Sequence, residues 1–323
     1  MPNNARLLLL DRDQVARVLR PDEVLTAVHE AFVLHSLGEG RVFPLVREKL
    51  ATGGVFGIKS GDVPAQHLLG FKAAGFWPGN RALGSEPHQA TIFLMNPATG
   101  RPECLIDGNE VTTQRTGAAG GLGIKYLARP DCQRVCVFGT GVQAKVQLEF
   151  ALRVMPSLRE VRYLSANCQP NAAFEALFSS RCTVLHALDA NQAVASSELV
   201  ITATTGKGPL FAASAVQPGT HINAVGTDTK GKRELPESLL SRARVFVDDS
   251  AQSLSIGELQ WAPTTPLVEI GDVLSCKTPF QRVPDDITVF DMTGIALQDL
   301  TVARLLYQGA LNAGTGTSIA WPW

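Results

Sequence analysis

Short apolar runs alternate with amphipathic or polar stretches along the second half of the chain. The run at 135–138, Val-Cys-Val-Phe, is apolar throughout, which is typical of a strand buried on both faces of a parallel sheet. Because the connectors between such runs leave room for helices, the alternation predicts a doubly wound α/β sheet within residues 130–296. The expected strands are 135–138, 161–165, 183–185, 199–204, 221–226, 245–248 and 287–291.

The first part of the chain has a different pattern, in which β-type runs follow one another without helices between them. A short strand at 7–10 and a helical region at 12–38 precede these runs. The expected strands are 42–50, 55–59, 68–75 and 88–95. The turn signals between them are 52–54, 61–64, 78–80 and 97–100. We expect a separate α+β domain over residues 1–129, to which a C-terminal helix at 297–323 returns.

A glycine motif follows the apolar run at 135–138. It reads Gly139-Thr-Gly141-Val-Gln-Ala144, and a helical pattern at 142–155 comes directly after it. Gly139 permits a tight turn, Gly141 lets a pyrophosphate approach the backbone, and Ala144 lets the helix pack close to the strand. The helix would offer free N–H groups and its positive dipole end to the phosphates. The motif therefore favours dinucleotide binding over an ordinary glycine-rich turn.

Loops at the carboxyl ends of the expected parallel strands are the places where such a sheet binds its ligand. The candidate cofactor-binding residues are Thr112, Gly139, Thr140, Gly141, Val142, Gln143, Ser165, Asn167, Thr204, Thr205, Val225, Gly226 and Gly294. The segment 164–167 contains neither an acid for a ribose nor an arginine for a 2′-phosphate. Because Ser165 and Asn167 offer only hydroxyl and amide partners, we expect NAD(H) rather than NADP(H).

Composition and charge exclude several classes of protein. The chain has 323 residues, 45% of them hydrophobic, and a net charge of −1, so it lacks the basic footprint of a nucleic-acid-binding protein. No apolar run approaches the ~18 residues of a membrane span, and the leucines at 7–10 are too few for a signal peptide. The 6 cysteines are scattered and complete no metal pattern. We expect a cytoplasmic protein with reduced thiols and no metal site.

Several stretches in combination resemble the ornithine cyclodeaminase/mu-crystallin family. They are 107–119 (Asp-Gly-Asn-Glu-Val-Thr-Thr-Gln-Arg-Thr-Gly-Ala-Ala), 139–144, 221–228 with 231–235, and 247–254 with 257–259. The family includes cyclodeaminases, alanine dehydrogenases and ketimine reductases. The resemblance implies a homodimer built through the first domain, a nicotinamide cofactor on the second, and an active site in the cleft between them.

The resemblance also implies roles for individual residues. Arg115 matches the ligand of the substrate α-carboxylate, and Arg47 matches a further carboxylate ligand. Lys72 matches an active-site lysine, which can donate a proton or hold the carboxylate. Asp228 matches an aspartate near the nicotinamide that handles the substrate nitrogen. His88 looks like the mu-crystallin branch, where it would face the cleft, although a structural hydrogen bond explains a strand histidine equally well.

Three functions agree with these residues. The first is an NAD(P)H-dependent imine reductase or amino-acid dehydrogenase that reduces a small 2-imino acid to an L-amino acid. The second is an NAD-dependent ornithine cyclodeaminase, and the third is an NADP(H)-binding protein of mu-crystallin type that sequesters a ligand. Cyclodeaminases carry a glutamate for the side-chain amine where this chain has Gly57. Because a buried ammonium without a carboxylate is costly, Gly57 favours the reductase.

Lys59 gives a clue to the substrate. It stands where related sequences usually have methionine, and it shares a strand face with Gly57 because side chains alternate along a strand. If that face lines the cleft, Lys59 joins Arg47, Lys72 and Arg115 around one small site. Such a cluster suits a dicarboxylic imine, as in the conversion of iminosuccinate to aspartate. Alternatively, Lys59 points to solvent at a strand edge, where lysines discourage aggregation.

Overall fold

The computed structural model describes residues 5–322, and the chain divides into two compact units. Unit 1 contains the chain up to Arg115 together with the segment from Ile295 onward, and unit 2 is Thr116–Gly294. The helix α3 (Gly108–Leu127) contributes residues to both. The domain limits predicted from the sequence, at 129/130 and 296/297, stay a prediction.

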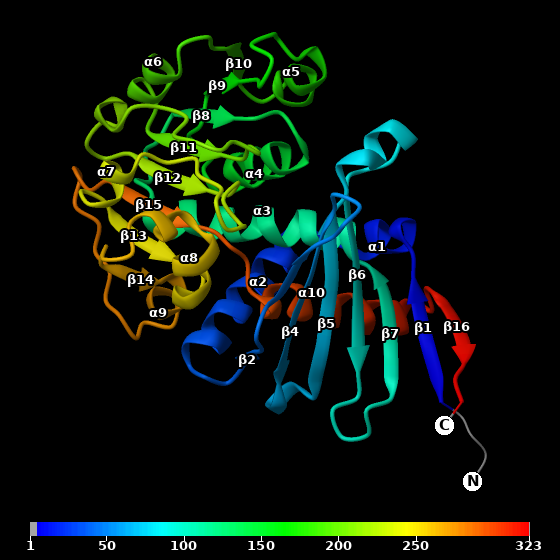
Figure 1. The fold of residues 1–323 in the computed structure, drawn as a ribbon. Helices are drawn as coiled ribbons and strands as arrows, with labels where there is room; N and C mark the ends of the chain where they lie inside the picture. Colours follow the sequence, from blue (N-terminus) through cyan, green and yellow to red (C-terminus); the bar gives the residue numbers. More distant parts are fainter. Residues whose placement is uncertain (1–4, 323) are drawn as a thin grey trace. The chain divides into compact units, whose positions relative to one another are not determined.

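Unit 1 is built on one mixed sheet whose strands run in the order β16-β1-β7-β6-β5-β4-β2, with β3 also paired to β4 (Figure 1). Only the β1–β7 pair is parallel. The strands are β1 (Arg6–Leu10), β2 (Arg41–Val42), β3 (Val46–Lys49), β4 (Val55–Val63), β5 (Leu68–Phe76), β6 (His88–Met95), β7 (Pro102–Asp107) and β16 (Thr317–Ala320). The helices of the unit are α1 (Arg12–Val18), α2 (Pro21–Ser36) and α10 (Ala296–Ala313), with short 3-10 turns at Pro64–Gln66 and Pro78–Leu83.

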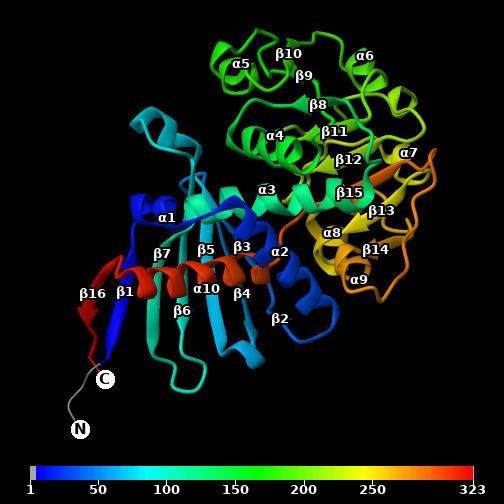
Figure 2. The same cartoon turned by 180° about the vertical axis from the view of Figure 1, so that it is seen from behind.

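One face of this sheet is covered by α10, which lies across the strands with α2 beside it (Figure 2). Two strand glycines allow the helix to come close. A Cβ at Gly61 would lie 2.3 Å from the Arg41 carbonyl oxygen, and one at Gly70 would lie 2.9 Å from Leu300. The side chains of α10 that face the sheet therefore pack closely against β4 and β5, which fixes their positions.

Several sequence predictions for unit 1 are wrong in detail. The segment 61–64, expected to be a turn, belongs mostly to β4, which continues to Val63 because its glycine is required for close packing rather than for bending. The single strand expected at 42–50 is split into β2 and β3. The helix expected over 297–323 ends at Ala313, where Gly314 adopts a left-handed conformation before β16.

Unit 2 has a parallel sheet in the order β10-β9-β8-β11-β12-β15-β13-β14, and its strands carry these labels in Figure 1. They are β8 (Arg134–Phe138), β9 (Glu160–Leu164), β10 (Thr183–His186), β11 (Leu199–Thr202), β12 (His221–Ala224), β13 (Arg244–Val247), β14 (Leu267–Glu269) and β15 (Thr288–Asp291). The helices are α4 (Val142–Val154), α5 (Ala172–Phe178), α6 (Ala190–Ala195), α7 (Glu237–Leu240), α8 (Ser250–Ile256) and α9 (Ile270–Leu274), with 3-10 turns at Ala213–Ala215 and Glu258–Trp261. The strand β14 was not predicted.

The apolar run at 135–138 is buried on both faces, as its composition predicts. Val135 and Val137 belong to one hydrophobic cluster of unit 2, whereas Cys136 and Phe138 belong to another. Alternate residues of β8 therefore point to opposite sides of the sheet, and each side has its own core. The predicted doubly wound arrangement is confirmed.

The part of α3 in unit 2 packs through glycines. A Cβ at Gly117 would lie 2.5 Å from Phe150, one at Gly120 would lie 1.9 Å from Gln147, and one at Gly123 would lie 2.6 Å from Phe290. These positions cannot carry larger side chains without displacing their neighbours. None of the helices within residues 5–322 combines the length and apolar character that crossing a membrane requires.

Candidate active site

Three charged side chains from distant parts of the chain meet inside unit 1. Lys72 on β5 lies with its Nζ 2.7 Å from Oδ1 of Asp299 on α10, and Arg115 on α3 places its Nε 3.0 Å from the same oxygen. The exposed fractions of the side chains are 4% for Lys72, 10% for Arg115 and 1% for Asp299. Because burial removes most solvent screening, this triad is a strongly coupled group of charges.

Neutral partners complete the fixing of the two cations. The Lys72 ammonium also donates to Thr112 Oγ1 at 3.3 Å, and Arg115 Nη1 donates to Gln298 Oε1 at 2.9 Å. Within residues 5–322, we find no hydrogen bond from Arg115 Nη2. The guanidinium is thus anchored at Nε and Nη1, and its predicted contact with a substrate carboxylate stays a prediction.

Burial and neighbouring charge set the protonation of this triad. Burial, together with the charges of Arg115 and Lys59, lowers the pKa of Lys72 to about 7, although Asp299 opposes this shift. Burial alone would raise the pKa of Asp299, but Arg115 and Lys72 outweigh it and hold that pKa below its ordinary value. At neutral pH the aspartate is ionised, and the lysine exchanges a proton readily.

Two further predicted residues share the sheet face of Lys72. Lys59 is the cross-strand partner of Lys72, and Gly57 is the partner of Arg47, so all four side-chain positions face the same way. The Arg47 side chain crosses Gly57, because a Cβ built there would lie 3.3 Å from Arg47 Cδ. The structure therefore places Arg47 and Lys59 on the face of the sheet that carries Lys72.

Lys59 does not lie at a sheet edge. Its strand β4 pairs with β5 on one side and with β2 and β3 on the other, and Lys59 is half-buried. The alternative prediction of an edge lysine is therefore wrong. The charge of Lys59 acts on both Lys72 and Asp299.

His88 begins β6 and is half-buried near these charges. Its Nδ1 lies 3.2 Å from Asn109 Oδ1, which is the structural hydrogen bond that the sequence left open. Burial, together with the nearby charge of Lys72, lowers the pKa of His88 to about 4. His88 is accordingly neutral at physiological pH and adds no positive charge to the cluster.

Sequence reasoning missed Asp299 and Gln298. Both lie in the first turn of α10, in a stretch where the apolar residues Leu297 and Leu300 dominated the pattern. The only available signal was an acid inside an otherwise apolar helix start, since Asp and Glu are rarely buried without a partner. Asp299 also changes the charge argument, because it balances one of the four cations.

The glycine motif of unit 2 has the geometry that its sequence predicts. Gly139 adopts a φ of +105°, and a Cβ there would lie 2.7 Å from the Ala203 carbonyl oxygen. Gly141 is the N-cap of α4 and provides no side-chain hydrogen bond to it, and a Cβ at Gly141 would meet no atom of residues 5–322 within 4 Å. Within the described residues, Gln143 Oε1 is buried without a hydrogen-bond partner. The start of α4 thus has open space and uncapped backbone N–H donors, which suit a phosphate.

Residues around this motif lie at the ends of neighbouring strands. Thr140 Oγ1 accepts a hydrogen bond from Asn171 Nδ2 at 3.1 Å, while Val142 is 47% exposed. After β9, Ser165 Oγ donates to the Gln169 carbonyl at 2.6 Å, and Asn167 Oδ1 accepts from Gln169 N at 3.2 Å. The loop at 165–169 is thus ordered by its own polar side chains.

Buried carboxylates hold the other strand-end loops of unit 2. Glu234 accepts hydrogen bonds from Thr204 N and Oγ1, both at 2.7 Å, and from Gly226 N at 2.8 Å. Val225 N bonds to the Thr202 carbonyl at 2.9 Å, while Thr205 is exposed. The loops after β11 and β12 are therefore tied to one acid that the sequence did not single out.

The end of β15 and the segment after it are held in a similar way. Asp248 accepts from Thr293 Oγ1 at 2.6 Å and from Gly294 N, and Gly294 adopts a φ of +77°. Thr112, which the sequence grouped with these cofactor loops, lies in unit 1 beside Lys72. Its predicted contact with the cofactor stays a prediction.

Asp228 lies in the loop after β12 and is 44% exposed. Its Oδ1 accepts from Lys232 Nζ at 2.7 Å and from Thr229 Oγ1 at 3.2 Å. Lys232 also donates to the Gly226 carbonyl at 3.1 Å, so it fixes the loop that carries Asp228. The spacing of four residues between Asp228 and Lys232 was visible in the sequence but was not used.

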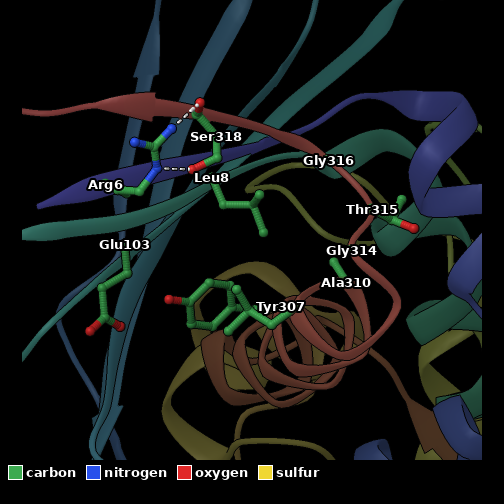
Figure 3. A pocket seen from close by; sticks show the side chains of 10 residues that line it. Arg6, Leu8, Glu103, Tyr307, Ala310, Gly314, Thr315, Gly316 and Ser318 are labelled. Atoms are coloured by element: carbon green, nitrogen blue, oxygen red, sulfur yellow. Dashed lines mark hydrogen bonds between the residues drawn. The ribbon is translucent and has the colours of Figure 1, made fainter. Parts of the chain in front are cut away.

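A separate pocket of about 270 Å³ lies in unit 1 between α10 and the strands β1, β7 and β16 (Figure 3). Tyr307 and Glu103 line it, and Arg6 bonds to Ser318 through Nε and Nη2 at its rim. None of the cations near Lys72 lines this pocket. Arg6 fastens the terminal strand β16 to β1, so we place the candidate site at the charged cluster instead.

The fold and these residues define a class before any relative is considered: an α/β protein that joins a Rossmann-type unit to an α+β unit with a buried cation cluster. A model of the ornithine cyclodeaminase/mu-crystallin family matches residues 6–314. The chain belongs to the ornithine cyclodeaminase/mu-crystallin family. The predicted family and the predicted fold class are both confirmed.

Individual relatives agree with this membership. The chain is 33% identical to the iminosuccinate reductase of Paracoccus denitrificans, over 97% of this chain and 99% of that protein. It is also 33% identical to the alanine dehydrogenase of Archaeoglobus fulgidus, over 97% of this chain and 98% of that one. A solved structure of an archaeal alanine dehydrogenase dimer with bound NAD superimposes with a TM-score of 0.92 at 31% identity, covering 98% of this chain and 100% of the other.

Proposed function

We propose that this protein is an imine reductase or amino-acid dehydrogenase that converts a small 2-imino acid into an L-amino acid. The enzyme class follows from the relatives: the chain is an NAD(P)-dependent oxidoreductase that acts on a CH–NH2 or C=N bond. The observation that carries the proposal is the buried triad of Lys72, Arg115 and Asp299. It combines a fixed guanidinium for a carboxylate with a lysine that titrates near neutrality.

The start of α4 fits a dinucleotide. The uncapped helix start and the open space at Gly141 are what a pyrophosphate requires. Reduced nicotinamide would supply the hydride for the reaction. Because Ser165 and Asn167 offer neutral partners to a ribose, we favour NAD(H) over NADP(H); the alanine dehydrogenase structure contains NAD.

The protein's own residues would then bind and protonate the substrate. We assign the α-carboxylate to Arg115, whose Nη2 remains for it, and the proton donor or carboxylate ligand to Lys72. Asp228 would act on the substrate nitrogen, and Lys232 holds its carboxylate in place. With these roles, the buried cations Lys72 and Arg115 of unit 1 bind the carboxylate end of the substrate, and the partly exposed Asp228 of unit 2 acts on its nitrogen.

The cations beside the triad support a dicarboxylic substrate. Asp299 balances one of the charges of Arg47, Lys59, Lys72 and Arg115, which leaves a surplus of positive charge. Two carboxylates, as in iminosuccinate, match that surplus better than one does. The P. denitrificans relative carries the name of an iminosuccinate reductase. We therefore propose iminosuccinate, reduced to aspartate, as the substrate.

The two other functions have less support. A glutamate at position 57, as in a cyclodeaminase, would have to enter space beside the Val46 carbonyl and the Arg47 side chain. The site at Gly57 therefore has no room for the acid that an ornithine amine needs. A protein that only sequesters a ligand has no need of a lysine whose pKa is lowered to about 7.

We also propose that the enzyme is a homodimer formed through the sheet of unit 1. The face opposite α10 carries Phe71 and Phe93, whose ring centroids are 5.4 Å apart, and Leu105 is 36% exposed in the same row. An apolar sheet face of this kind is typical of an interface. The archaeal alanine dehydrogenase was solved as a dimer. The free cysteines agree with a cytoplasmic enzyme.

The substrate proposal is tested by following NADH absorbance with imines formed from ammonia and either oxaloacetate or pyruvate. We expect wild type to prefer the dicarboxylic imine and Lys59→Met to narrow that preference. Lys49→Met, which removes an exposed lysine from the neighbouring strand, is the matched control and should leave the preference unchanged. Equal use of both imines by wild type, or the same ratio in Lys59→Met, contradicts the proposal. Ammonia release from ornithine would instead indicate a cyclodeaminase.

A further inference from the structure

Asp299 accepts hydrogen bonds from two proposed site residues through a single oxygen. Its Oδ1 receives Lys72 Nζ at 2.7 Å and Arg115 Nε at 3.0 Å. Its other oxygen, Oδ2, is buried and makes no hydrogen bond with any described residue. The carboxylate therefore does not serve as a general cap or turn, because all its hydrogen bonds within the described chain go to these two cations.

The position of Asp299 is set by the packing of α10. On either side of Asp299, Leu297 approaches Gly61 and Leu300 approaches Gly70, the two strand glycines beneath the helix. The first turn of α10 is buried throughout. A carboxylate on such a rigid element can fix the ends of two long and otherwise mobile side chains.

We propose that Asp299 is a positioning residue, which holds the Lys72 ammonium and the Arg115 guanidinium in place and keeps Lys72 protonated in its working pH range. This inference rests on the proposed imine reduction. In either of its roles, as proton donor or as carboxylate ligand, Lys72 works only as an ammonium. When it donates, the Nζ–H bond breaks as a bond forms between hydrogen and the substrate nitrogen, and solvent later restores the proton.

The charges that face Lys72 determine how strongly Asp299 matters. Arg115 on α3 and Lys59 on β4 disfavour the ammonium, His88 on β6 is neutral, and burial acts in the same direction as the cations. Asp299 on α10 is the carboxylate that opposes them. Removing its charge lowers the pKa of Lys72 further, so that the lysine loses its proton at a lower pH.

The test compares pH profiles of kcat/KM for imine reduction in wild type and three variants. In Asp299→Asn we expect the limb that falls with rising pH to move about one pH unit lower or more, so that activity at pH 8 declines about fivefold or more beyond any decline at pH 6. In Asp299→Glu the charge remains but its oxygen is displaced. We expect this variant to keep the limb near its wild-type pH while kcat falls at least severalfold.

Glu30→Gln is the matched control, because Glu30 also forms an ion pair with α10, at Arg304, away from the cluster. It should leave both the limb and kcat unchanged. An Asp299→Asn profile with the wild-type limb and a uniformly lower amplitude would mean that Asp299 serves stability alone. If Asp299→Asn does not fold, Asp299→Glu provides the test. A kcat equal to that of wild type in Asp299→Glu would refute the proposal that Asp299 positions Lys72 and Arg115. Absence of imine reduction in wild type would instead refute the proposed function.

Discussion

Two fully buried aspartates, one in each unit, behave in opposite ways. Asp299 in unit 1 lies between Lys72 and Arg115, and these cations hold its pKa below the ordinary value. Burial, together with the nearby acids Glu258 and Asp248, raises the pKa of Asp291 in unit 2 to about 8. Since burial is the same, the charge of the neighbours alone decides whether each carboxyl is ionised at neutral pH.

The difference extends to the way each unit uses its acids. In unit 2, Asp291 accepts from Ser253 Oγ and Leu259 N, and Glu258 accepts from Thr227 Oγ1 and two backbone amides. Neutral donors of this kind fix loops without concentrating charge. Unit 1 instead gathers opposite charges around an open guanidinium nitrogen. The buried acids of unit 2 thus hold loops in place, whereas the buried acid of unit 1 pairs with cations.

The sharpest way to break this comparison is to neutralise each aspartate in turn. Asp299→Asn leaves Lys72 and Arg115 buried without their counter-charge, and we expect a loss of about 3–5 kcal/mol in the free energy of unfolding. Asp291→Asn replaces a carboxyl that is largely protonated at pH 7, so its cost should be on the order of 1 kcal/mol. Urea unfolding of each variant, monitored by hydrogen exchange, measures both losses in the free energy of unfolding. Equal losses would show that the charged neighbours of Asp299 are unimportant.

Removing the cation instead of the acid should affect the reaction more than the fold. We expect Arg115→Ala to raise KM for the imine and to lower kcat/KM by about 2–4 kcal/mol, because a ligand carboxylate loses its charged partner. The Kd of NADH should remain as in wild type, since the phosphate-binding motif belongs to unit 2. Steady-state kinetics and fluorescence titration with NADH separate the two effects. A weakened NADH affinity with an unchanged KM would reverse the assignment.

Gly139→Ala should have the opposite effect to Arg115→Ala, because it should weaken NADH binding rather than imine binding. Its φ of +105° and the Ala203 carbonyl 2.7 Å from an added Cβ make alanine strained, at a cost of about 1–3 kcal/mol. Because the glycine turn would shift, we expect the Kd of NADH to rise while the preference among imines is kept. Gly141→Ala is the control for backbone strain, since its φ is −78° and its Cβ would meet open space. An unchanged NADH affinity in Gly139→Ala would contradict the predicted site.

The smallest effect is a pH dependence of stability. The folded pKa values of Asp291 and Glu258, about 8 and about 7, lie above their unfolded values of ~4, so the stability that they contribute is fully present below ~pH 4 and is lost as pH rises from there to 7–8. Lys72, lowered to about 7, acts oppositely, because its cost is relieved as pH rises above 7. Between pH 6 and 7, the free energy of unfolding of Asp291→Asn should fall by up to about 1.4 kcal/mol less than that of wild type, as measured by chemical unfolding at each pH. If the free energy of unfolding changed with pH in the same way in wild type and in Asp291→Asn, the raised pKa of Asp291 would be refuted.

The parallel sheet of unit 2 could be predicted because each strand is buried on both faces and therefore apolar throughout. The short strands β14 and β16 could not, since β16 is exposed along its whole length and has no apolar period. The composition of residues 61–64 predicted a turn, although most of this segment belongs to the strand β4. The reason is that Gly61 is required by the Arg41 carbonyl above it, which only the folded sheet reveals.

The candidate site was predictable only where a motif marked it. Lys72 and Arg115 stand in stretches that resemble the family, whereas Asp299 is separated from them by 227 and 184 residues. Nothing in a single sequence pairs residues over such distances unless the fold is known. Lys232 differs, because its distance of four residues from Asp228 made their ion pair accessible to local reasoning.

The glycines of α3 bear on how the enzyme folds. Each glycine in a helix interior costs about 1 kcal/mol relative to alanine, so Gly117, Gly120 and Gly123 make this helix weak on its own. Its second half gains stability only when Phe150, Gln147 and Phe290 pack against it. Arg115 stands on the same continuous helix, just before the first of these glycines. Cooperativity follows: the guanidinium acquires a rigid support only after the second half of this helix has packed, and a chain cut after Arg115 would carry it on a fraying end.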